Sequence, residues 1–544
     1  MVQFSAFDYV KMAYSVALVI FSIVIVTALM FERKTSVSQG ASPVVALVVM
    51  WVGILWMSMV EGGQCSMVGL PPIDRELYKE SHPITYQITS LGHKGDNLNR
   101  YLMGRQFMVI FINFTIGLCG APVAGAEVFG LPDWVTAIFL GSGIAMVLTN
   151  VNIGQLTAQC NASHCMLDYI NTHFMTFTLY VTLMIEFTGV MHVCYLIRDC
   201  FYWGAGKPVE TKEPPRSGAQ NLFYWGRVLF SVVVLGFSIA VTVSAIFRGK
   251  TAVWDGVPPI VSCILLLVFM VVIGMLEGMQ IAFFAVCKLP EAERANSPWA
   301  NRTVDLLFKG DGRNLPGFMV GRQMTVTLCF FIVGRILSIQ STVGEEGHTT
   351  DENIFGLPDR FQTFLGMGFL GAILTTILAS ITWQLVAGAF PLQFLSFPLV
   401  FILLNCALAL EYTGICHASW FFGIIHKKIA GFQLDEVYVG TPEERAARGK
   451  GDVDDNASDM GTNVLVPPPG SRGIPKEWKA VSDKSYAEKR SEIMTNIKNL
   501  RAEAGAAGSD GERKVFEHSL QLEVAALEKL NAQQSDSGTD TENC

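Results

Sequence analysis

Long apolar runs constrain this chain more than any other feature of its sequence. An α-helix needs about 20 apolar residues to cross the hydrocarbon core of a bilayer. Only 16% of the 544 residues are charged and 51% are hydrophobic, whereas a soluble domain carries about 25% charge. A soluble enzyme is therefore excluded. The sequence predicts an all-α polytopic membrane protein with ten transmembrane helices, at residues 12–31, 41–60, 105–124, 134–151, 174–196, 224–246, 258–276, 320–339, 361–385 and 394–422.

Polar segments divide the chain into five parts. A linker at 197–223 separates five spans in residues 1–196 from five spans in residues 224–425. Residues 426–475 are rich in Gly, Pro and Asp and are predicted to be a disordered linker. In residues 476–544 apolar positions recur at steps of three, four and seven, which predicts a soluble tail with a short coiled coil. This coiled coil is the candidate surface for self-association or for a cytosolic partner, while the net charge of −8 excludes nucleic acid as a partner.

The two groups of five spans repeat each other in sequence. Glu61-Gly62-Gly63-Gln64 recurs as Glu277-Gly278-Met279-Gln280, and Gly104-Arg105-Gln106 recurs as Gly321-Arg322-Gln323. The segments 129–133 and 355–359 are identical. Because each group holds an odd number of spans, the second group would enter the membrane from the opposite side. We therefore predict two inverted five-helix repeats, an arrangement typical of secondary transporters that bind substrate near the interface between repeats.

The repeated motifs supply the candidate binding residues. Glutamine offers one acceptor and two donors, which suits a small neutral solute that carries hydroxyl groups. Glycine lets a ligand approach the backbone closely, and arginine can orient the carboxylate of a neighbouring motif. Gln155-Leu156 recurs as Gln384-Leu385, and these glutamines either join the site or bond helices together. The predicted substrate-binding residues are Glu61, Gly62, Gln64, Gly104, Arg105, Gln106, Glu277, Gly278, Gln280, Gly321, Arg322, Gln323, Gln155 and Gln384.

Two acidic residues lie inside predicted spans. Glu186 and Glu411 belong to a repeated Glu-aromatic-Thr-Gly motif, and a charge at bilayer depth costs roughly 2.5–3.5 kcal/mol, so it is a functional hypothesis by default. Carboxylate and hydroxyl oxygens from Glu186, Thr188, Glu411 and Thr413 would suit a bound Na⁺, whereas Glu with His192 or His417 would suit a proton relay. The alternative is a purely structural role, as a neutral glutamic acid in a buried hydrogen-bond network.

A metal site is not predicted. Cys160, His164, Cys165, Asp168 and His173 are residues of metal-binding type, but their spacing fits no zinc motif. The corresponding stretch near Phe394 lacks all of them. A site essential to two symmetric halves should occur twice, so this stretch is interpreted as regulatory or structural.

The motifs together resemble those of one family, the silicon transporters of diatoms. The resemblance rests on the paired Glu-Gly-x-Gln and Gly-Arg-Gln motifs, the ten-span core, Cys165-Met166-Leu167-Asp168 and the coiled-coil tail, and it covers residues 10–425. It implies uptake of orthosilicic acid, with Na⁺ as coupling ion and no further cofactor. It also implies that substrate is bound by Gly62, Gln64, Gly104, Gln106, Gly278, Gln280, Gly321 and Gln323.

Silicic acid fits the predicted site in chemical terms. It is a neutral tetrahedral molecule with four hydroxyls, and glutamines from two halves would surround it with donors and acceptors. Sodium-coupled uptake by alternating access is the favoured function, and the alternative is a channel or uniporter for silicic acid or another small neutral hydroxylated solute. No enzymatic activity is expected. Lys427 and Lys428 follow the last span and favour cytoplasmic N- and C-termini in the plasma membrane, with an intracellular vesicle membrane as the other address.

Overall fold

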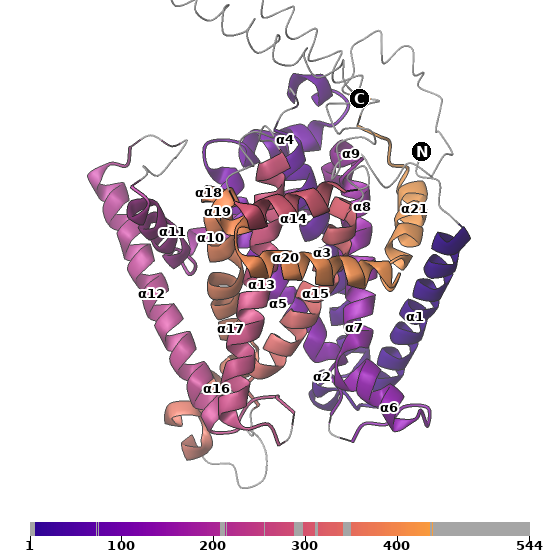
Figure 1. The fold of residues 1–544 in the computed structure, drawn as a ribbon. Coiled ribbons are helices and arrows are strands. Elements are labelled where there is room, and N and C mark those ends of the chain that lie inside the picture. The colour runs from indigo at the N-terminus through magenta and orange to yellow at the C-terminus, as the bar shows by residue number, and fades with distance from the viewer. Residues whose placement is uncertain are drawn as a thin grey trace, which may run out of the picture. The chain divides into compact units, whose positions relative to one another are not determined.

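The computed structural model describes residues 6–435 and Tyr438, except 72, 74, 124, 207–212, 214, 255, 288–296, 310–313 and 341–349. The chain divides into two compact units, 1–466 and 467–544, and all the described residues belong to the first unit (Figure 1). This part is helical throughout, apart from two isolated β-bridges. The predicted coiled coil in 476–544 and nearly all of the predicted linker 426–475 lie outside the described residues.

The first half of the unit contains four long membrane segments. Three are the single helices α1 (Ala6–Phe31), α3 (Pro43–Gly69) and α5 (Asn97–Gly120), and the fourth is the pair Asp133–Gly141 and Ile144–Ala162, bent by 53°. The bent pair contains α6 (Asp133–Thr136), the π-helix η2 (Ala137–Gly141), α7 (Ile144–Thr149), the π-helix η3 (Asn150–Leu156) and α8 (Thr157–Ala162). Shorter helices connect or follow them, namely α2 (Ser36–Gly40), α4 (Pro83–Gly92), α9 (Met166–Ile170), α10 (His173–Phe187) and α11 (Val193–Gly204).

The second half repeats this order of elements. Its long segments are α12 (Gly218–Phe247), α13 (Pro259–Cys287), α15 (Asn314–Leu337) and Phe369–Ala389, which comprises α17 (Phe369–Thr375), the π-helix η7 (Thr376–Ile381) and α18 (Thr382–Ala389). The shorter elements are α14 (Pro298–Phe308), α16 (Asp359–Gly366), α19 (Pro391–Leu395), α20 (Pro398–Tyr412) and α21 (Ala418–Ala430).

Backbone geometry repeats along with the sequence. Phe129 and Phe355 both have a positive φ, of 54° and 56°, and each is followed by a left-handed glycine. The identical Phe-Gly-Leu-Pro-Asp segments are thus turns that lead into α6 and α16, and an aspartate in the first turn of each helix complements its dipole. The internal repeat read from the sequence is therefore also a repeat of local structure.

The prediction of ten crossings is not supported. Among the described residues, seven helices are long and apolar enough to cross a membrane, or eight if the bent pair is one span. The predicted spans 174–196 and 394–422 are each broken, because Gly189 and Gly414 adopt φ values of 82° and 77° and end α10 and α20 after 15 residues. A 15-residue helix is about 22 Å long, which is too short for a hydrocarbon core of about 30 Å.

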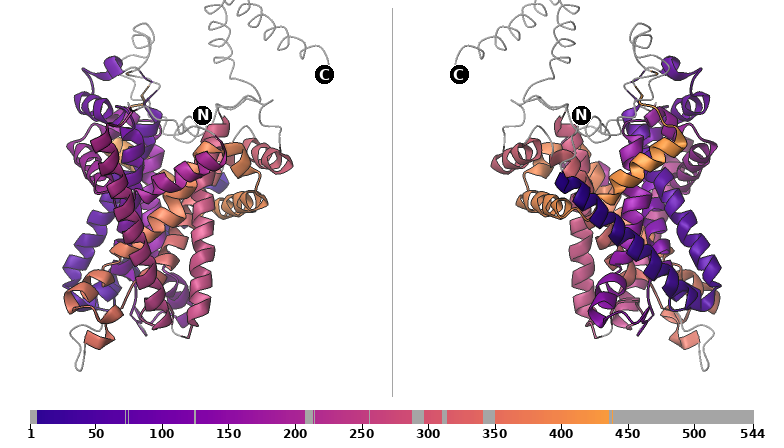
Figure 2. Two further views of the ribbon diagram at one scale, coloured as in Figure 1. Left: turned by 90° about the vertical axis from the view of Figure 1, so that its left-hand side faces the viewer. Right: turned by 90° about the vertical axis from the view of Figure 1, so that its right-hand side faces the viewer.

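The predicted inversion of the two halves is not confirmed either, because it depended on five crossings per half. In Figure 1, α1 and α12 both run from the same end of the bundle to the other, and the right-hand view of Figure 2 shows α1 along this whole path. Equivalent loops also meet at one end: Ser36 and Ala252 line the same pocket, as do Ala121 and Ser338. Equivalent helices of the two halves therefore run in the same direction, and we describe the halves as parallel. We call the end where α1 begins and α21 ends the terminal face, and the end with α2, α6 and α16 the vestibule face.

Helices α1 and α12 each carry a serine that bonds backbone groups at a broken helix pair of the other half. Ser15 of α1 donates to the carbonyl of Ile415 and accepts from the backbone N–H of Ala418. These bonds satisfy backbone groups at the break between α20 and α21. In the same way Ser231 of α12 bonds Val190 and Val193 at the break between α10 and α11. Backbone groups freed by a broken helix must be satisfied inside a membrane, so these two serines allow both breaks to exist.

Candidate functional site

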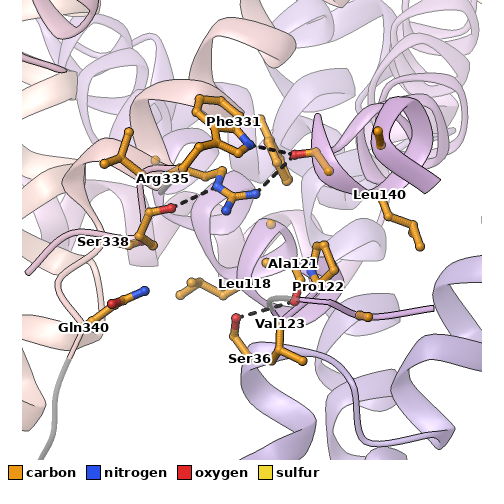
Figure 3. Close-up of a pocket in the computed structure, with 18 of the residues that line it drawn as sticks. Ser36, Leu118, Ala121, Pro122, Val123, Leu140, Phe331, Arg335, Ser338 and Gln340 are labelled. Carbon is orange, nitrogen blue, oxygen red and sulfur yellow. Dashed lines mark hydrogen bonds between the residues drawn. The ribbon is translucent and has the colours of Figure 1, made fainter. Parts of the chain in front are cut away.

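A cavity of about 780 Å³ lies between the two halves at the vestibule face. It is lined by α5, α15 and the loops at their ends, and we call it the vestibule (Figure 3). On one side the Arg335 guanidinium donates to the carbonyls of Ala252 (3.0 Å) and Gly141 (3.2 Å), and the Trp254 indole N–H donates to Gly141 as well (3.2 Å). These bonds tie the second half to the bend between α6 and α7 of the first half. Asn113 belongs to the lining, although its side chain is only 8% exposed.

The repeated motifs make two buried ion pairs, one within each half. Arg105 pairs with Glu61 at 2.5 Å, and Arg322 pairs with Glu277 at 3.0 Å. Each arginine also donates to the side-chain oxygen of the glutamine that follows it, Gln106 or Gln323. The predicted role of arginine, to orient the carboxylate of the partner motif, is thus confirmed. Because each positive charge is neutralised by a carboxylate, the centre of the protein holds no uncompensated charge from these motifs.

The glutamine that completes each ion pair is not the one expected from sequence. Gln384 donates to Glu277 at 2.6 Å, and the equivalent bond in the first half comes from Gln159, which donates to Glu61 at 2.9 Å. The predicted correspondence of Gln155 with Gln384 is therefore wrong. Gln159 and Gln384 are 225 residues apart, the same separation as Glu186 and Glu411, and this constant separation is the signal that identifies Gln159.

The motif glycines serve helix packing. A Cβ on Gly104 would lie 1.9 Å from the carbonyl oxygen of Thr182 in α10, and a Cβ on Gly321 would lie 1.8 Å from that of Ala407 in α20. Gly62 and Gly278 lie against the rings of Tyr169 and Phe394, and a Cβ on either glycine would likewise clash with the ring. These contacts account for the four glycines without any ligand.

Gly104→Ala is therefore expected to destabilise the protein. The contact is with backbone, which cannot swing away, so the substitution should lower the free energy of unfolding by about 1–3 kcal/mol or more. Gly226→Ala is the matched control, because nothing lies within 4 Å of that position and alanine is the better helix former by about 1 kcal/mol. Equilibrium unfolding in detergent would measure both variants, and equal stability would contradict the packing assignment.

Gln64 and Gln280 lie one turn beyond the ion pairs. Both are half-buried, and neither has a side-chain hydrogen bond to another described residue. Neither of them lines the vestibule, and neither bonds the side chain of Gln155 or Gln323.

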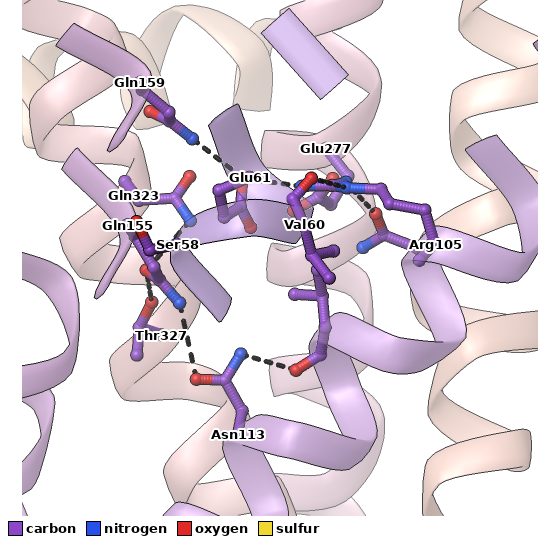
Figure 4. Close-up of polar contacts among 12 residues, drawn as sticks. Ser58, Val60, Glu61, Arg105, Asn113, Gln155, Gln159, Glu277, Gln323 and Thr327 are labelled. Atoms are coloured by element: carbon purple, nitrogen blue, oxygen red, sulfur yellow. Dashed lines mark hydrogen bonds and ion pairs between the residues drawn. The ribbon is translucent and has the colours of Figure 1, made fainter. Parts of the chain in front are cut away.

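A group of uncharged polar side chains is centred on Gln155. Its side-chain oxygen accepts from Gln323 and from Thr327, both at 2.9 Å, and its amide nitrogen lies 3.4 Å from the Asn113 oxygen (Figure 4). Asn150 donates to the same Asn113 oxygen at 2.7 Å. Gln155 is fully buried, and its bonds to Gln323 and Thr327 cross from the first half to the second. We call Asn113, Asn150, Gln155, Gln323 and Thr327 the amide cluster.

The amide cluster contains a buried acceptor that has no partner. The side-chain oxygen of Asn150 accepts no hydrogen bond, although a buried polar group without a partner costs about 1–3 kcal/mol. Asn150 belongs to the π-helix η3, a form that is frequent at functional sites. Sequence reasoning missed Asn113, Asn150 and Thr327, because none of them belongs to a repeated motif.

The predicted coupling-ion residues do not converge. The hydroxyls of Thr188 and Thr413 are exposed and donate to carbonyls of their own helices, those of Ile185 and Leu410. Glu186 is buried and accepts from the Tyr195 hydroxyl at 3.3 Å, with His192 at 3.6 Å. Within the described ranges no group of three or more His, Cys, Asp or Glu residues could hold a metal ion.

Comparison with known proteins gave one result. The sequence matches the family model described as "Silicon transporter" over residues 3–543. Neither the curated proteins nor the solved structures contain a match.

Proposed function

The chain belongs to the silicon transporter family, and we propose that it carries orthosilicic acid across the membrane through the amide cluster, by alternating access coupled to Na⁺. The observation that carries the proposal is the cluster itself, a buried set of amides that joins the two halves next to the vestibule. The ion pairs are assigned a supporting role, because Arg322 holds the oxygen of Gln323 and leaves its amide nitrogen directed at Gln155.

The chemistry of the amide cluster suits a neutral polyol-like solute. Each hydroxyl of silicic acid can donate and accept, and the unpartnered oxygen of Asn150 would accept a hydroxyl hydrogen. A solute that replaces internal bonds of Gln155 keeps the amide satisfied, which lowers the desolvation penalty of binding. An arginine without a counter-charge at this place would select anions. Both arginines are paired with glutamates, so the site suits a neutral solute.

Parallel halves suit alternating access about an axis along the membrane normal, as in other transporters with parallel repeats. The vestibule reaches the cluster at Asn113, which belongs to both. We infer that rocking of the halves closes the vestibule and opens a path to the terminal face.

The terminal face is proposed to be cytoplasmic. The three connections that start and end there, 70–96, 205–217 and 288–313, contain eleven Lys and Arg residues, whereas the four connections at the vestibule face contain four. Cytoplasmic loops carry the excess of positive charge, so the vestibule would open to the outside, as uptake at the plasma membrane requires. An epitope at residue 544 that antibodies reach without permeabilisation would overturn this orientation.

Coupling to Na⁺ supplies the driving force in this proposal. An uncharged solute gains nothing from the membrane potential, whereas one charge that moves through 100 mV releases about 2.3 kcal/mol. Among the residues expected to handle the ion, the Glu186 carboxylate is the buried one.

The test is uptake of silicic acid into proteoliposomes that contain the full chain, with and without an inward Na⁺ gradient. The expected result is accumulation beyond equilibrium that disappears when K⁺ replaces Na⁺. Equilibration that ignores the gradient would establish a channel or uniporter instead. No uptake by protein shown to be folded would overturn the assignment of the substrate path.

A further inference from the structure

The chain that follows α21 is bonded to the Cys165–Asp168 segment of the first half. The Asp435 carboxylate accepts from the backbone N–H groups of Met166 and Leu167, each at 2.9 Å. In the opposite sense the Asp168 carboxylate accepts from the backbone N–H of Gln433 at 2.6 Å. The backbone N–H of Asp435 also donates to the carbonyl of His164 at 3.1 Å. The two segments therefore exchange hydrogen bonds reciprocally, with a carboxylate on each side.

Further contacts surround this exchange. His82 of the α3–α5 connection bonds the other oxygen of Asp168 at 2.9 Å, and the Tyr438 ring lies edge-on to His82 with centroids 4.4 Å apart. Phe432 packs against His426 and Tyr169. Burial, together with the nearby Asp168 carboxylate, raises the pKa of Tyr438, so its hydroxyl stays neutral at physiological pH. Asp435 is 7% exposed, hence its carboxylate depends on these partners for its hydrogen bonds.

These contacts join the two halves at the terminal face. Helix α21 belongs to the second half, whereas α4, α9 and His82 belong to the first. The position equivalent to Asp168 in the second half is Gln393, 225 residues later, so the carboxylate exists on one side only. Charge-assisted hydrogen bonds to a buried carboxylate are among the stronger bonds in a protein.

We propose that residues 431–435, together with Tyr438, form a strap that holds the terminal face closed, and that the Cys165–Asp168 segment is its docking site. The inference rests on the proposed alternating access, because opening a path to the terminal face separates the halves there and must break contacts that cross between them. The tail, residues 439–544, follows the strap directly in the sequence. A load on the tail would thus act on the equilibrium between outward-open and inward-open states.

The test measures that equilibrium with a cysteine in the vestibule. Leu118→Cys lines the vestibule, and a membrane-impermeant maleimide added outside would label it in the outward-open state, with the same protein lacking this cysteine as background. Asp435→Asn and Asp168→Asn each weaken the docking of the strap. Gln433→Ala is the matched control, because Gln433 contributes its backbone N–H to the exchange.

Asp435→Asn and Asp168→Asn are expected to slow labelling, and the control is expected to leave it unchanged. One lost charge-assisted bond shifts an equilibrium about tenfold, and a tenfold shift from about 90% outward-open leaves about 50%, so labelling should slow about twofold. Melting temperatures of the detergent-purified variants identify any that fails to fold. If one carboxylate variant fails to fold, the labelling rate of the other carboxylate variant tests the proposal.

Two results have different meanings. If labelling of the parent protein responds to silicic acid but neither carboxylate variant changes it, the strap proposal is overturned and alternating access stands. If labelling of the parent protein ignores silicic acid and uptake shows channel behaviour, the proposed function fails and the strap fails with it.

Discussion

Arg322→Met will destabilise the protein by about 3–5 kcal/mol, because it leaves the Glu277 carboxylate buried without its counter-charge. Glu277 is 5% exposed, and its other polar contact is the Gln384 amide at 2.6 Å. A single neutral amide does not replace a guanidinium that lies 3.0 Å away. Methionine replaces the aliphatic part of the arginine side chain, so lost packing is a smaller part of the effect than the lost counter-charge.

The double variant Glu277→Gln/Arg322→Met separates charge from packing. With both charges removed the buried site is neutral, and such replacements are often harmless to stability, so most of the lost free energy should return. Uptake should stay low in both variants, because Gln323 loses the bond that orients its amide toward Gln155. Equilibrium unfolding in detergent, paired with uptake assays, measures both effects. A double variant as unstable as the single one would mean that the pair acts through packing and not through charge.

The apolar runs predicted where the membrane helices lie, but they could not predict which of them cross. The runs 174–196 and 394–422 are as apolar as true spans, yet each contains a Thr-Gly step whose glycine adopts a left-handed conformation. An apolar window averages over a glycine and conceals such a break. The inverted orientation of the second half was inferred from five crossings per half, which is an odd number. One broken helix in each half removes one crossing from each count, and an even number gives both halves the same orientation.

The internal repeat predicted the residues that hold the helices together better than it predicted the residues of the amide cluster. Residues that occur twice, such as Arg105 with Arg322 and Gly104 with Gly321, build ion pairs and helix contacts in both halves. The amide cluster is one-sided: Asn113 corresponds to Phe330, Asn150 to Thr375 and Gln155 to Ser380. A search for matched motifs favours symmetric residues, whereas a single site on a pseudo-symmetry axis can draw most of its contacts from one half.

Gln155→Met is expected to reduce silicic acid uptake by roughly 10–100-fold. The substitution keeps the size of the side chain but removes the oxygen that accepts from Gln323 and Thr327 and the amide nitrogen next to Asn113. Loss of one buried polar partner costs about 1–3 kcal/mol, and each 1.36 kcal/mol in the barrier changes a rate tenfold.

Ser380→Ala is the control that uses the repeat. Ser380 occupies the equivalent position of the second half, and its hydroxyl has only a long contact of 3.5 Å with Gln384, so uptake should stay near that of the parent protein. Initial rates in proteoliposomes, normalised to folded protein, would compare the two variants. Equal losses would mean that substrate passes symmetrically between the halves, whereas a loss confined to Gln155 would place the path on the side of η3. The second result would also explain why the π-helix η3 carries amide side chains, whereas the polar side chains of the π-helix η7 are hydroxyls.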